Sequence, residues 1–259
     1  MKFIAIFRLA LFAFISALAP LIQFPILCFA KGRGIFFVPK IWHRAVCRIF
    51  NIKVHVTGAL ENEHHTLYLT NHVSYLDIPV LGGYLSASFI AKADVENWPL
   101  FGFLSKLQKT VFIQRTRKGL SSAQKMIEDR LDQGHNLTLF AEGTSTQGHH
   151  VLPFKSSLFE LIATQKIRDQ LYIQPITIQV KAINGAPPQK PDDLDIYAWH
   201  GDMTLAPHLW QLAQNKSVDI NLHFHPARPV KEFKDRKDIA KQTHKVVAGH
   251  LQFSFDPQQ

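Results

Sequence analysis

The chain has 259 residues, 46% of them apolar, so it is long enough for one large domain with a sizeable core. Only two cysteines occur, which excludes a disulfide framework and indicates a reducing compartment. The formal net charge is +9, and the first 60 residues contain Lys and Arg but no Asp or Glu. Nucleic-acid binders usually spread positive charge over a folded face, whereas this charge flanks an apolar run. It therefore indicates anionic lipid headgroups and no nucleic acid.

The apolar run LALFAFISALAPLIQFPILCFA covers residues 9–30. As a helix it would be roughly 33 Å long, close to the thickness of a bilayer core. Pro20 and Pro25 interrupt it, so a kinked span and a pair of helices entering one leaflet both fit the pattern. A cleaved signal peptide is a further alternative, which Pro20 directly after Ala-Leu-Ala disfavours. More Lys and Arg follow the run than precede it, which predicts that the downstream chain lies on the cytoplasmic face of the inner membrane.

The next stretch, IWHRAVCRIF at residues 41–50, repeats apolar residues at helical spacing and places Arg44 and Arg48 on another face. It predicts a basic amphipathic helix at the membrane surface or, equally, a helix that packs on the following domain. We therefore expect a membrane anchor with a basic amphipathic helix over residues 1–50 and an α/β domain over residues 51–259.

From residue 52 onward, short β-like runs alternate with helical ones. Strands are predicted at 53–57, 66–70, 88–91, 110–114, 137–140, 172–180 and 219–225. Helices are predicted near 76–84, 99–107, 119–133, 154–164, 205–214 and 236–251. This alternation favours an α/β fold with a mainly parallel, twisted sheet flanked by helices and preceded by the N-terminal membrane-associated helical segment.

The stretch NHVSYLD, residues 71–77, follows a predicted strand. Because Pro79 is tolerated only in the first turn of a helix, a helix should begin just before it. His72 then lies in a loop and Asp77 lies near the helix start, where a carboxylate can orient the imidazole and raise the basicity of its other nitrogen. The alternative is that Ser74 and Asp77 form a capping box and His72 is an ordinary loop residue.

Two further polar clusters also follow predicted strands, and ligands in open α/β sheets bind beyond the carboxyl ends of strands. Arg115 ends one strand, where a basic side chain can hold phosphate or simply belong to a solvated turn. Glu142 and Gly143 end another, where the glycine would let backbone amides face a ligand, although a plain turn is the alternative. Lys155 stands at a predicted helix start, where a cation is unfavourable unless an anion lies nearby or the side chain reaches water.

Taken together, these clusters resemble sequence blocks of the glycerolipid acyltransferase family typified by the 1-acylglycerol-3-phosphate acyltransferases. The matching residues, in family order, are 71–77 for N-H-x-x-x-x-D, 112–115 for an F-I-x-R-like stretch, 140–145 for F-P-E-G-T-R and 173–177 for a hydrophobic block with a proline. The third block departs from the family pattern at Ala141 and Ser145. The N-terminal apolar segment also suits the family.

The resemblance implies transfer of a fatty acyl group from an acyl-carrier-protein or coenzyme A thioester to the free hydroxyl of a lysolipid, without a metal or bound cofactor. His72 would be the general base that takes the proton of the attacking alcohol, and Asp77 would orient it. The implied acceptor-binding residues are Phe112, Arg115, Glu142, Gly143, Thr144, Ser145 and Lys155. The expected partners are therefore membrane lipids and a thioester donor.

The departure at Ser145 bears on the acceptor, because the family's arginine there is thought to hold a phosphate, and serine cannot replace a bidentate guanidinium contact. Either Arg117, Lys118 or Lys155 substitutes, or the acceptor carries no phosphate. The frequency of activities in the family favours 1-acylglycerol-3-phosphate as acceptor, giving phosphatidic acid. The alternative is O-acylation of lyso-ornithine lipid, since EGTS followed by LPFKSSLF, and WHGDM at 199–203, resemble the bacterial members with that activity.

Three other functions each fit part of the sequence. A hydrolase would use Ser74 as its nucleophile, but the chain contains no G-x-S-x-G elbow. A non-catalytic membrane lipid binder would bind lysolipid without turnover. The histidine pairs at 64–65 and 149–150 suggest a metal, but adjacent side chains rarely converge on one ion, so no metal is expected.

Overall fold

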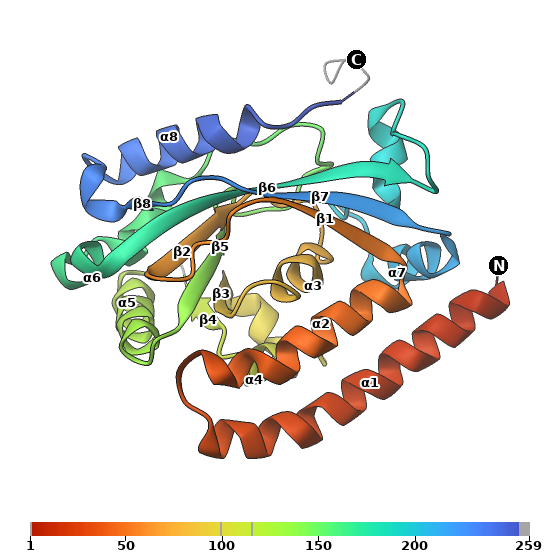
Figure 1. Ribbon diagram of the computed structural model, residues 1–259, viewed down its shortest axis with the longest axis horizontal. Coiled ribbons are helices and arrows are strands. Elements are labelled where there is room, and N and C mark those ends of the chain that lie inside the picture. Colours follow the sequence, from red (N-terminus) through yellow and green to blue (C-terminus); the bar gives the residue numbers. More distant parts are fainter. Residues whose placement is uncertain (1, 99, 115, 254–259) are drawn as a thin grey trace.

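A mixed sheet of eight strands lies at the centre of the described chain, which comprises residues 2–98, 100–114 and 116–253 of this computed structural model (Figure 1). The strand order is β1-β7-β6-β2-β5-β3-β4, with β8 paired to β6 off this path. The strands are β1 (Ile52–Gly58), β2 (His65–Thr70), β3 (Ala87–Lys92), β4 (Val111–Ile113), β5 (Asn136–Phe140), β6 (Leu171–Ile183), β7 (Val218–Phe224) and β8 (Arg228–Pro229).

Most neighbouring strands of this sheet run parallel, as the sequence predicts. The pairs β6–β2, β2–β5, β5–β3 and β3–β4 are parallel, whereas β7 is antiparallel to β6, and β1 is parallel to β7. The seven predicted strands are confirmed. β8 was not predicted, because two residues are too few to produce an alternating pattern.

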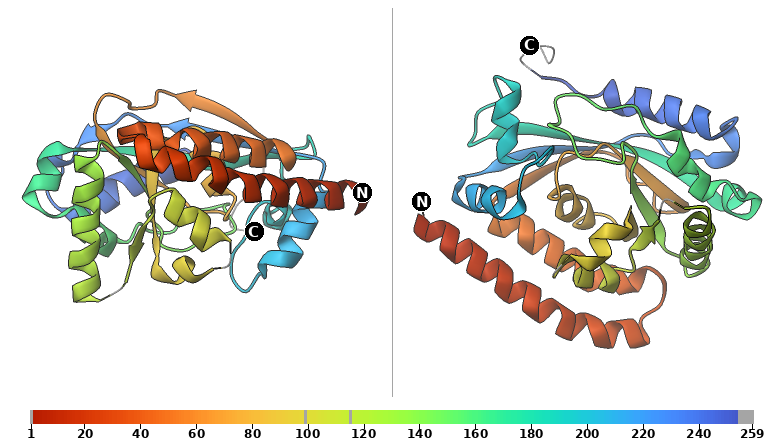
Figure 2. Two further views of the ribbon diagram at one scale, coloured as in Figure 1. Left: turned by 90° about the horizontal axis from the view of Figure 1, so that it is seen from below. Right: turned by 180° about the vertical axis from the view of Figure 1, so that it is seen from behind.

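Helices cover both faces of the sheet (Figure 2). They are α1 (Lys2–Phe29), α2 (Phe37–Ile49), α3 (Asp77–Gly82), α4 (Phe101–Leu107), α5 (Arg117–Asp132), α6 (Gln165–Gln170), α7 (Leu205–Gln214) and α8 (Arg236–Ala248). Short 3-10 helices occupy Gly32–Phe36, Ala93–Asn97, Ser156–Ile162, Pro191–Ile196 and Val230–Glu232. The α-helix predicted near 154–164 is wrong, because over seven residues an apolar pattern cannot distinguish a period of 3.0 from one of 3.6.

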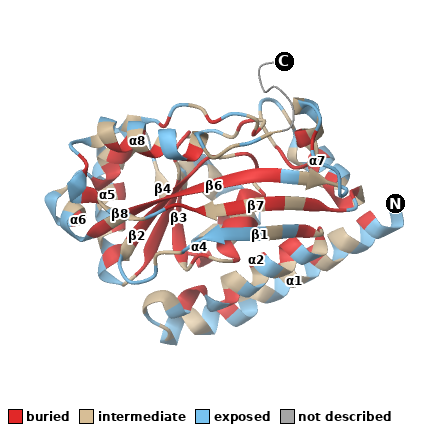
Figure 3. Cartoon of the chain, turned by 45° about the horizontal axis from the view of Figure 1, so that its top comes forward, coloured by how far each residue is buried: buried red, intermediate tan, exposed pale blue. Residues whose placement is uncertain are grey.

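Two hydrophobic cores lie on opposite faces of the sheet. One contains apolar side chains of α2 and α3 packed on the even-numbered residues of β6 and β7, and the other contains side chains of α5 and α8 packed on β2 and β5. Figure 3 shows the buried central strands and the largely exposed outer surface of α1. The sheet therefore separates the polar side chains on one of its faces from those on the other.

The predicted apolar run forms part of one helix, α1, which continues through Pro20 and Pro25 and begins at Lys2. By length and composition α1 is able to cross a membrane. Its large apolar side chains mostly point away from the protein: the exposed ones are Phe3, Ile4, Ile6, Phe7, Phe14, Leu18, Leu21, Ile22, Phe24 and Phe29. Such a surface is unfavourable in water and is of the kind that contacts a membrane or another protein.

Polar contacts hold α1 against the rest of the protein along its length. Arg8 near its start donates to the main-chain carbonyls of Ala213 and Asn215 at 3.1 and 2.6 Å. Ser16 in its middle accepts a hydrogen bond from the indole of Trp42 on α2. Gln23 near its end is 2% exposed and donates to main-chain carbonyls of the neighbouring segments. Figure 1 shows α1 lying beside α2 across the base of the domain.

The helix predicted over 41–50 is α2, which packs directly on α3. A Cβ added at Gly82 of α3 would lie 2.2 Å from the ring of His43, so only glycine permits this close approach. Arg44 donates from Nε to the carbonyl of Gly83 at 2.7 Å. Phe37 and Ile41 remain exposed on the outer side of α2. The helix therefore packs on the domain through one face and presents apolar side chains on another.

Candidate active site

The turn between β2 and α3 brings the predicted histidine and aspartate together. His72 lies in the loop after β2, and Asp77 is the first residue of α3, with Pro79 in its first turn, as expected. His72 Nδ1 lies 2.8 Å from Asp77 Oδ2. The same oxygen accepts hydrogen bonds from the amides of Val73 and Ser74 at 2.7 and 3.0 Å.

The carboxylate of Asp77 is completely buried and fully hydrogen-bonded. Its second oxygen, Oδ1, accepts a hydrogen bond of 2.9 Å from the hydroxyl of Tyr197. Because a carboxylate surrounded by donors acts only as an acceptor, Nδ1 of His72 must donate, and its Nε2 keeps a free lone pair. Burial and hydrogen bonding together fix both the position of the carboxylate and the tautomer of the imidazole.

The imidazole of His72 stacks on Phe140, with 3.9 Å between ring centroids and 20° between ring planes. Its side chain is 20% exposed, so a ligand can reach it from solvent. Asn71, the preceding residue, forms paired hydrogen bonds of 2.9 Å with the main chain of Ile178 in β6. The end of β2 is therefore tied to its neighbour in the sheet, and the ring has little freedom to move.

Glu142 is buried behind this turn, with both carboxylate oxygens hydrogen-bonded to the main chain. Oε1 accepts from the amide of His72 at 2.7 Å, and Oε2 accepts from the amide of Leu152 at 2.6 Å. Burial raises the pKa of Glu142 to about 7, although the two amide hydrogen bonds oppose this shift. Because the side chain is completely buried and contacts the main chain of His72 and Leu152, it is placed to hold this turn and not to face a ligand.

This raised pKa predicts a pH-dependent stability. Between about pH 4.5 and about pH 7 the folded protein keeps a proton on Glu142 that the unfolded chain releases, so the free energy of unfolding falls as pH rises through this window. We expect Glu142→Gln to make this fall smaller, by up to about 3 kcal/mol, because glutamine does not titrate. Urea unfolding at several pH values in the window measures both slopes, and equal slopes would contradict the assignment.

Four of the other residues predicted to bind the acceptor, at positions 143, 144, 145 and 155, lie close to one another. Gly143 has φ of 68°, and a Cβ there would lie 3.1 Å from Cδ of Lys155, so the lysine side chain lies directly against this glycine. Thr144 and Lys155 are exposed, and Ser145 is half-buried. These four residues share a surface beside the loop that carries His72. The segment after Ser145 is bound to this loop, because the amide of Thr146 donates to the carbonyl of His72 at 2.9 Å.

Phe112 does not join this group. Phe112 is a half-buried residue of β4, which lies three strands from β2 in the sheet order, a separation of roughly 14 Å. Arg115 lies outside the described residues. Motif order along the sequence therefore does not by itself place Phe112 beside the imidazole.

Ser74, the nucleophile of the alternative hydrolase mechanism, is completely buried. Its hydroxyl has no hydrogen-bond partner among the described residues, and its amide donates to Asp77. The hydroxyl therefore makes no hydrogen bond to either nitrogen of His72, so the arrangement lacks the serine–histidine contact that a triad requires.

Tyr197 and the segment around it, which contact the turn at 71–77, were not predicted from the sequence. This tyrosine is buried and donates its hydroxyl proton to Asp77, and two residues later the amide of Trp199 donates to the carbonyl of Val73 at 2.9 Å. Trp199 was noted only for its resemblance to a branch of the family. No local pattern links Tyr197 to a carboxylate 120 residues away, so this contact had no sequence signal.

A buried carboxylate that orients an accessible imidazole suits proton abstraction from an alcohol, and the similarities of the chain point to the same chemistry. The family profile described as Acyltransferase matches residues 51–179. A lyso-ornithine lipid O-acyltransferase of Rhizobium meliloti is 33% identical over 90% of this chain and 82% of its own length. The chain belongs to the lysophospholipid acyltransferase family, as the four sequence blocks indicated, and is a lysolipid O-acyltransferase.

Other relatives come from two branches of this family. A lyso-ornithine lipid O-acyltransferase of Brucella abortus is 35% identical over 83% of this chain and 82% of that protein. A 1-acyl-sn-glycerol-3-phosphate acyltransferase of Neisseria meningitidis is 27% identical over 73% of this chain and 71% of that protein. The crystal structure of a 1-acyl-sn-glycerophosphate acyltransferase of Thermotoga maritima has the same fold, with a TM-score of 0.67 and 18% identity, and covers 96% of this chain and 92% of that one.

Proposed function

We propose that His72 is the general base of acyl transfer and that Asp77 positions it. The observation that carries this proposal is the 2.8 Å hydrogen bond between His72 Nδ1 and Asp77 Oδ2. It leaves Nε2 as the nitrogen that can take a proton, and the exposed part of the ring allows a substrate to approach.

In the proposed reaction the hydroxyl oxygen of the lysolipid attacks the thioester carbonyl of the donor while its proton moves to Nε2 of His72. A new C–O bond forms and gives a tetrahedral oxyanion, whose collapse breaks the C–S bond. The departing thiolate takes the proton back from the imidazolium, so no strong general acid is needed. Asp77 stabilises the imidazolium during this interval, because its charge lies 2.8 Å away in a buried site.

Around this centre we assign the acceptor headgroup to the surface formed by Gly143, Thr144, Ser145 and Lys155. Glu142, which was expected to bind the acceptor, is instead assigned to positioning the main chain of His72. For Arg115 the support is the family resemblance alone. Acyl-carrier protein or coenzyme A would deliver the acyl group.

The proposed acceptor is lyso-ornithine lipid, the alternative in the sequence analysis, in place of 1-acylglycerol-3-phosphate. Two observations support this choice. The lyso-ornithine lipid O-acyltransferases of Rhizobium meliloti and Brucella abortus are 33% and 35% identical to this chain, and the 1-acyl-sn-glycerol-3-phosphate acyltransferase of Neisseria meningitidis is 27% identical. The chain also carries Ser145 where the family motif has arginine, and a serine cannot form a bidentate phosphate contact.

A direct test offers the purified protein, in detergent, lyso-ornithine lipid and lysophosphatidate separately, each with acyl-carrier-protein and coenzyme A thioesters. We expect acylation of lyso-ornithine lipid at the higher kcat/KM. A preference for lysophosphatidate would refute the proposed acceptor while leaving the general-base mechanism standing. Lipid binding without any turnover would refute the mechanism itself.

Ser145→Arg tests the headgroup assignment. A guanidinium at this half-buried position would supply a phosphate contact, so we expect kcat/KM for lysophosphatidate to rise roughly tenfold, as one charge-assisted hydrogen bond allows. Ser145→Lys is the matched control, because it adds the charge without the planar fork and should give a smaller gain. Initial rates with both acceptors measure the change, and an unaltered acceptor preference in the arginine variant would count against this surface.

We further propose that residues 1–50 anchor the acyltransferase domain, residues 51–259, to the cytoplasmic face of the inner membrane. The exposed apolar side of α1 would enter the lipid, while its contacts through Arg8, Ser16 and Gln23 keep the helix lying along the domain. Because α2 packs on α3, this arrangement would hold the imidazole close to the membrane surface, where lysolipid is found.

A further inference from the structure

Three histidines gather on the face of the sheet opposite the candidate active site. His223 lies in β7, His225 follows that strand by one residue, and His250 lies two residues beyond α8. Their ligand nitrogens all lie within 4.8 Å of one another. The rings of His223 and His250 stack at 3.9 Å between centroids, and His225 meets both of them edge-on. We call this group the three-histidine cluster.

The cluster is separated from His72 by the sheet itself. Leu222 and Phe224, the alternate residues of β7, pack in the core beside α3, so His223 points to the other face. On that face the hydroxyl of Thr177 in β6 donates to the main-chain carbonyl of Val247 in α8. The cluster therefore lies between the sheet and the chain that follows α8.

Hydrogen bonds orient two of the imidazoles as in a metal site. Nε2 of His225 lies 2.9 Å from Oγ1 of Thr177. Since that hydroxyl gives its single proton to Val247, its oxygen must accept from His225 Nε2–H, which leaves Nδ1 of His225 with a free lone pair. Nδ1 of His223 lies 2.8 Å from Oγ1 of Thr57, where either group can be the donor; in the tautomer in which the histidine donates, its Nε2 remains for a ligand. Metal-binding histidines usually have such a partner on the other ring nitrogen.

We infer that the three-histidine cluster binds one divalent transition-metal ion, Zn²⁺ in the first place. Imidazole suits Zn²⁺, whereas the absence of a carboxylate among the three ligands makes Mg²⁺ and Ca²⁺ poor candidates. Zn–N bonds of about 2.0–2.1 Å hold tetrahedral nitrogens roughly 3.4 Å apart, so the stacked rings of His223 and His250 would rotate to aim their lone pairs at one ion. Solvent would occupy the fourth position.

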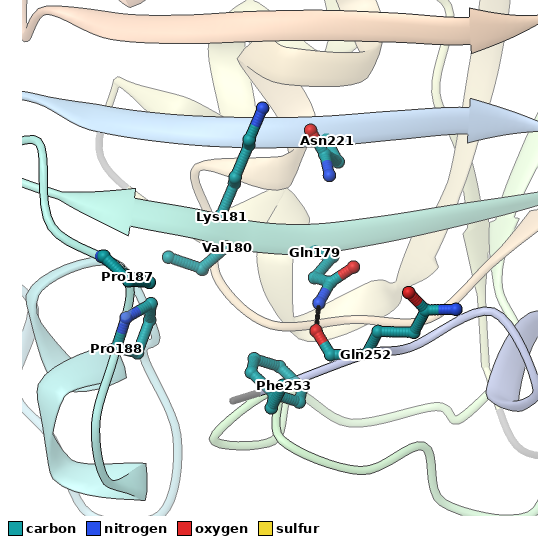
Figure 4. Close-up of a pocket in the computed structure, with 8 residues that line it drawn as sticks. All are labelled: Gln179, Val180, Lys181, Pro187, Pro188, Asn221, Gln252 and Phe253. Carbon is teal, nitrogen blue, oxygen red and sulfur yellow. Dashed lines mark hydrogen bonds between the residues drawn. The ribbon is translucent and has the colours of Figure 1, made fainter. Parts of the chain in front are cut away.

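A metal here would join the segment after α8 to the sheet. His250 is two residues from Gln252, whose main-chain carbonyl accepts a hydrogen bond from the side chain of Gln179 in β6 (Figure 4). Both glutamines line a pocket of about 170 Å³ over β6 and β7, together with Asn221 of the same β7 face as His223. The ligands of one ion would therefore come from β7 and from this segment, and binding should stabilise their contact.

The test uses the full chain in detergent, with any polyhistidine tag removed and metals stripped by a chelator. We expect one Zn²⁺ per chain after reloading and desalting, measured by inductively coupled plasma mass spectrometry, and a Zn²⁺-dependent increase in Tm. Bound Co²⁺ should show the visible absorption of a tetrahedral site. Less than about 0.1 Zn²⁺ per chain would overturn the inference.

Variants locate the ion. His250→Asn, at a half-buried position, should weaken Zn²⁺ binding roughly 100-fold or more and abolish the increase in Tm; Thr177→Val, which removes only the orienting hydroxyl, should weaken binding about 10-fold. His150→Asn is the matched control, because His149 and the exposed His150 form a separate pair whose rings lie 4.4 Å apart. Loss of Zn²⁺ binding in the control but not in His250→Asn would assign the ion to that pair and refute the cluster.

Discussion

Replacing His72 with alanine is expected to lower kcat/KM for lysolipid acylation by about 10²–10⁴-fold, because general-base catalysis contributes that much. The loss should appear in kcat, since the imidazole acts on the proton that moves in the transition state. Initial rates with purified protein in detergent measure it, and an unchanged Tm would show that the variant is folded. Its side chain is 20% exposed and stacks on one face only, so truncation leaves a small cavity at the surface.

Ser74→Ala is the matched control for this experiment. The hydroxyl is buried and has no described hydrogen-bond partner, so its removal should leave kcat within about twofold. If instead Ser74→Ala were inactive and a covalent acyl-enzyme accumulated in the wild type, the protein would use the serine as its nucleophile and the proposed mechanism would fall.

Asp77→Asn should reduce kcat by roughly 10³–10⁴-fold with little change in shape. The asparagine amide would present N–H groups where the carboxylate now accepts from Nδ1 of His72, so the imidazole would adopt the tautomer with a proton on Nε2. That tautomer cannot accept the proton of the alcohol. The measurement is kcat against pH, with Tm monitored because the amides of Val73 and Ser74 lose part of their acceptor.

Tyr197→Phe separates the tautomer effect from a general loosening of the site. It removes one hydrogen bond to the same carboxylate but keeps the negative charge and the ring volume, so we expect a loss of about 10-fold in kcat. An Asp77→Asn variant no less active than Tyr197→Phe would show that orientation of His72 by a charged carboxylate is not required.

The helix pair α1–α2 is joined to the active-site turn through two other helices. It contacts α3, where Gly82 allows His43 of α2 to approach, and α1 also contacts α7, whose His208 lies 3.0 Å from the hydroxyl of Tyr75 in the turn. His43 is buried and hydrogen-bonded to Gln108 at 2.9 Å, so it joins α2 to the segment after α4 as well. The exposed apolar surface of α1 is therefore connected to Asp77 by close packing and not by a flexible linker.

Sequence alone was sufficient for the parts of this protein that depend on neighbours along the chain. Alternating and helical periods predicted seven strands and most α-helices, because side-chain direction follows directly from backbone geometry. The start of α3 was predictable for the same reason, because Pro79 restricts it and leaves His72 and Asp77 close enough to meet; that they do meet, in place of the capping-box alternative, was decided by the structure.

Tertiary structure decided the contacts between distant segments. Tyr197 meets Asp77 across 120 residues, Glu142 meets the main chain of His72 across 70, and the three-histidine cluster combines β7 with the end of the chain described after α8. These contacts depend on the order and direction of strands in the sheet, which no local period specifies. A sequence pattern records which face of a strand is apolar, but only the assembled sheet determines which strand lies beside it.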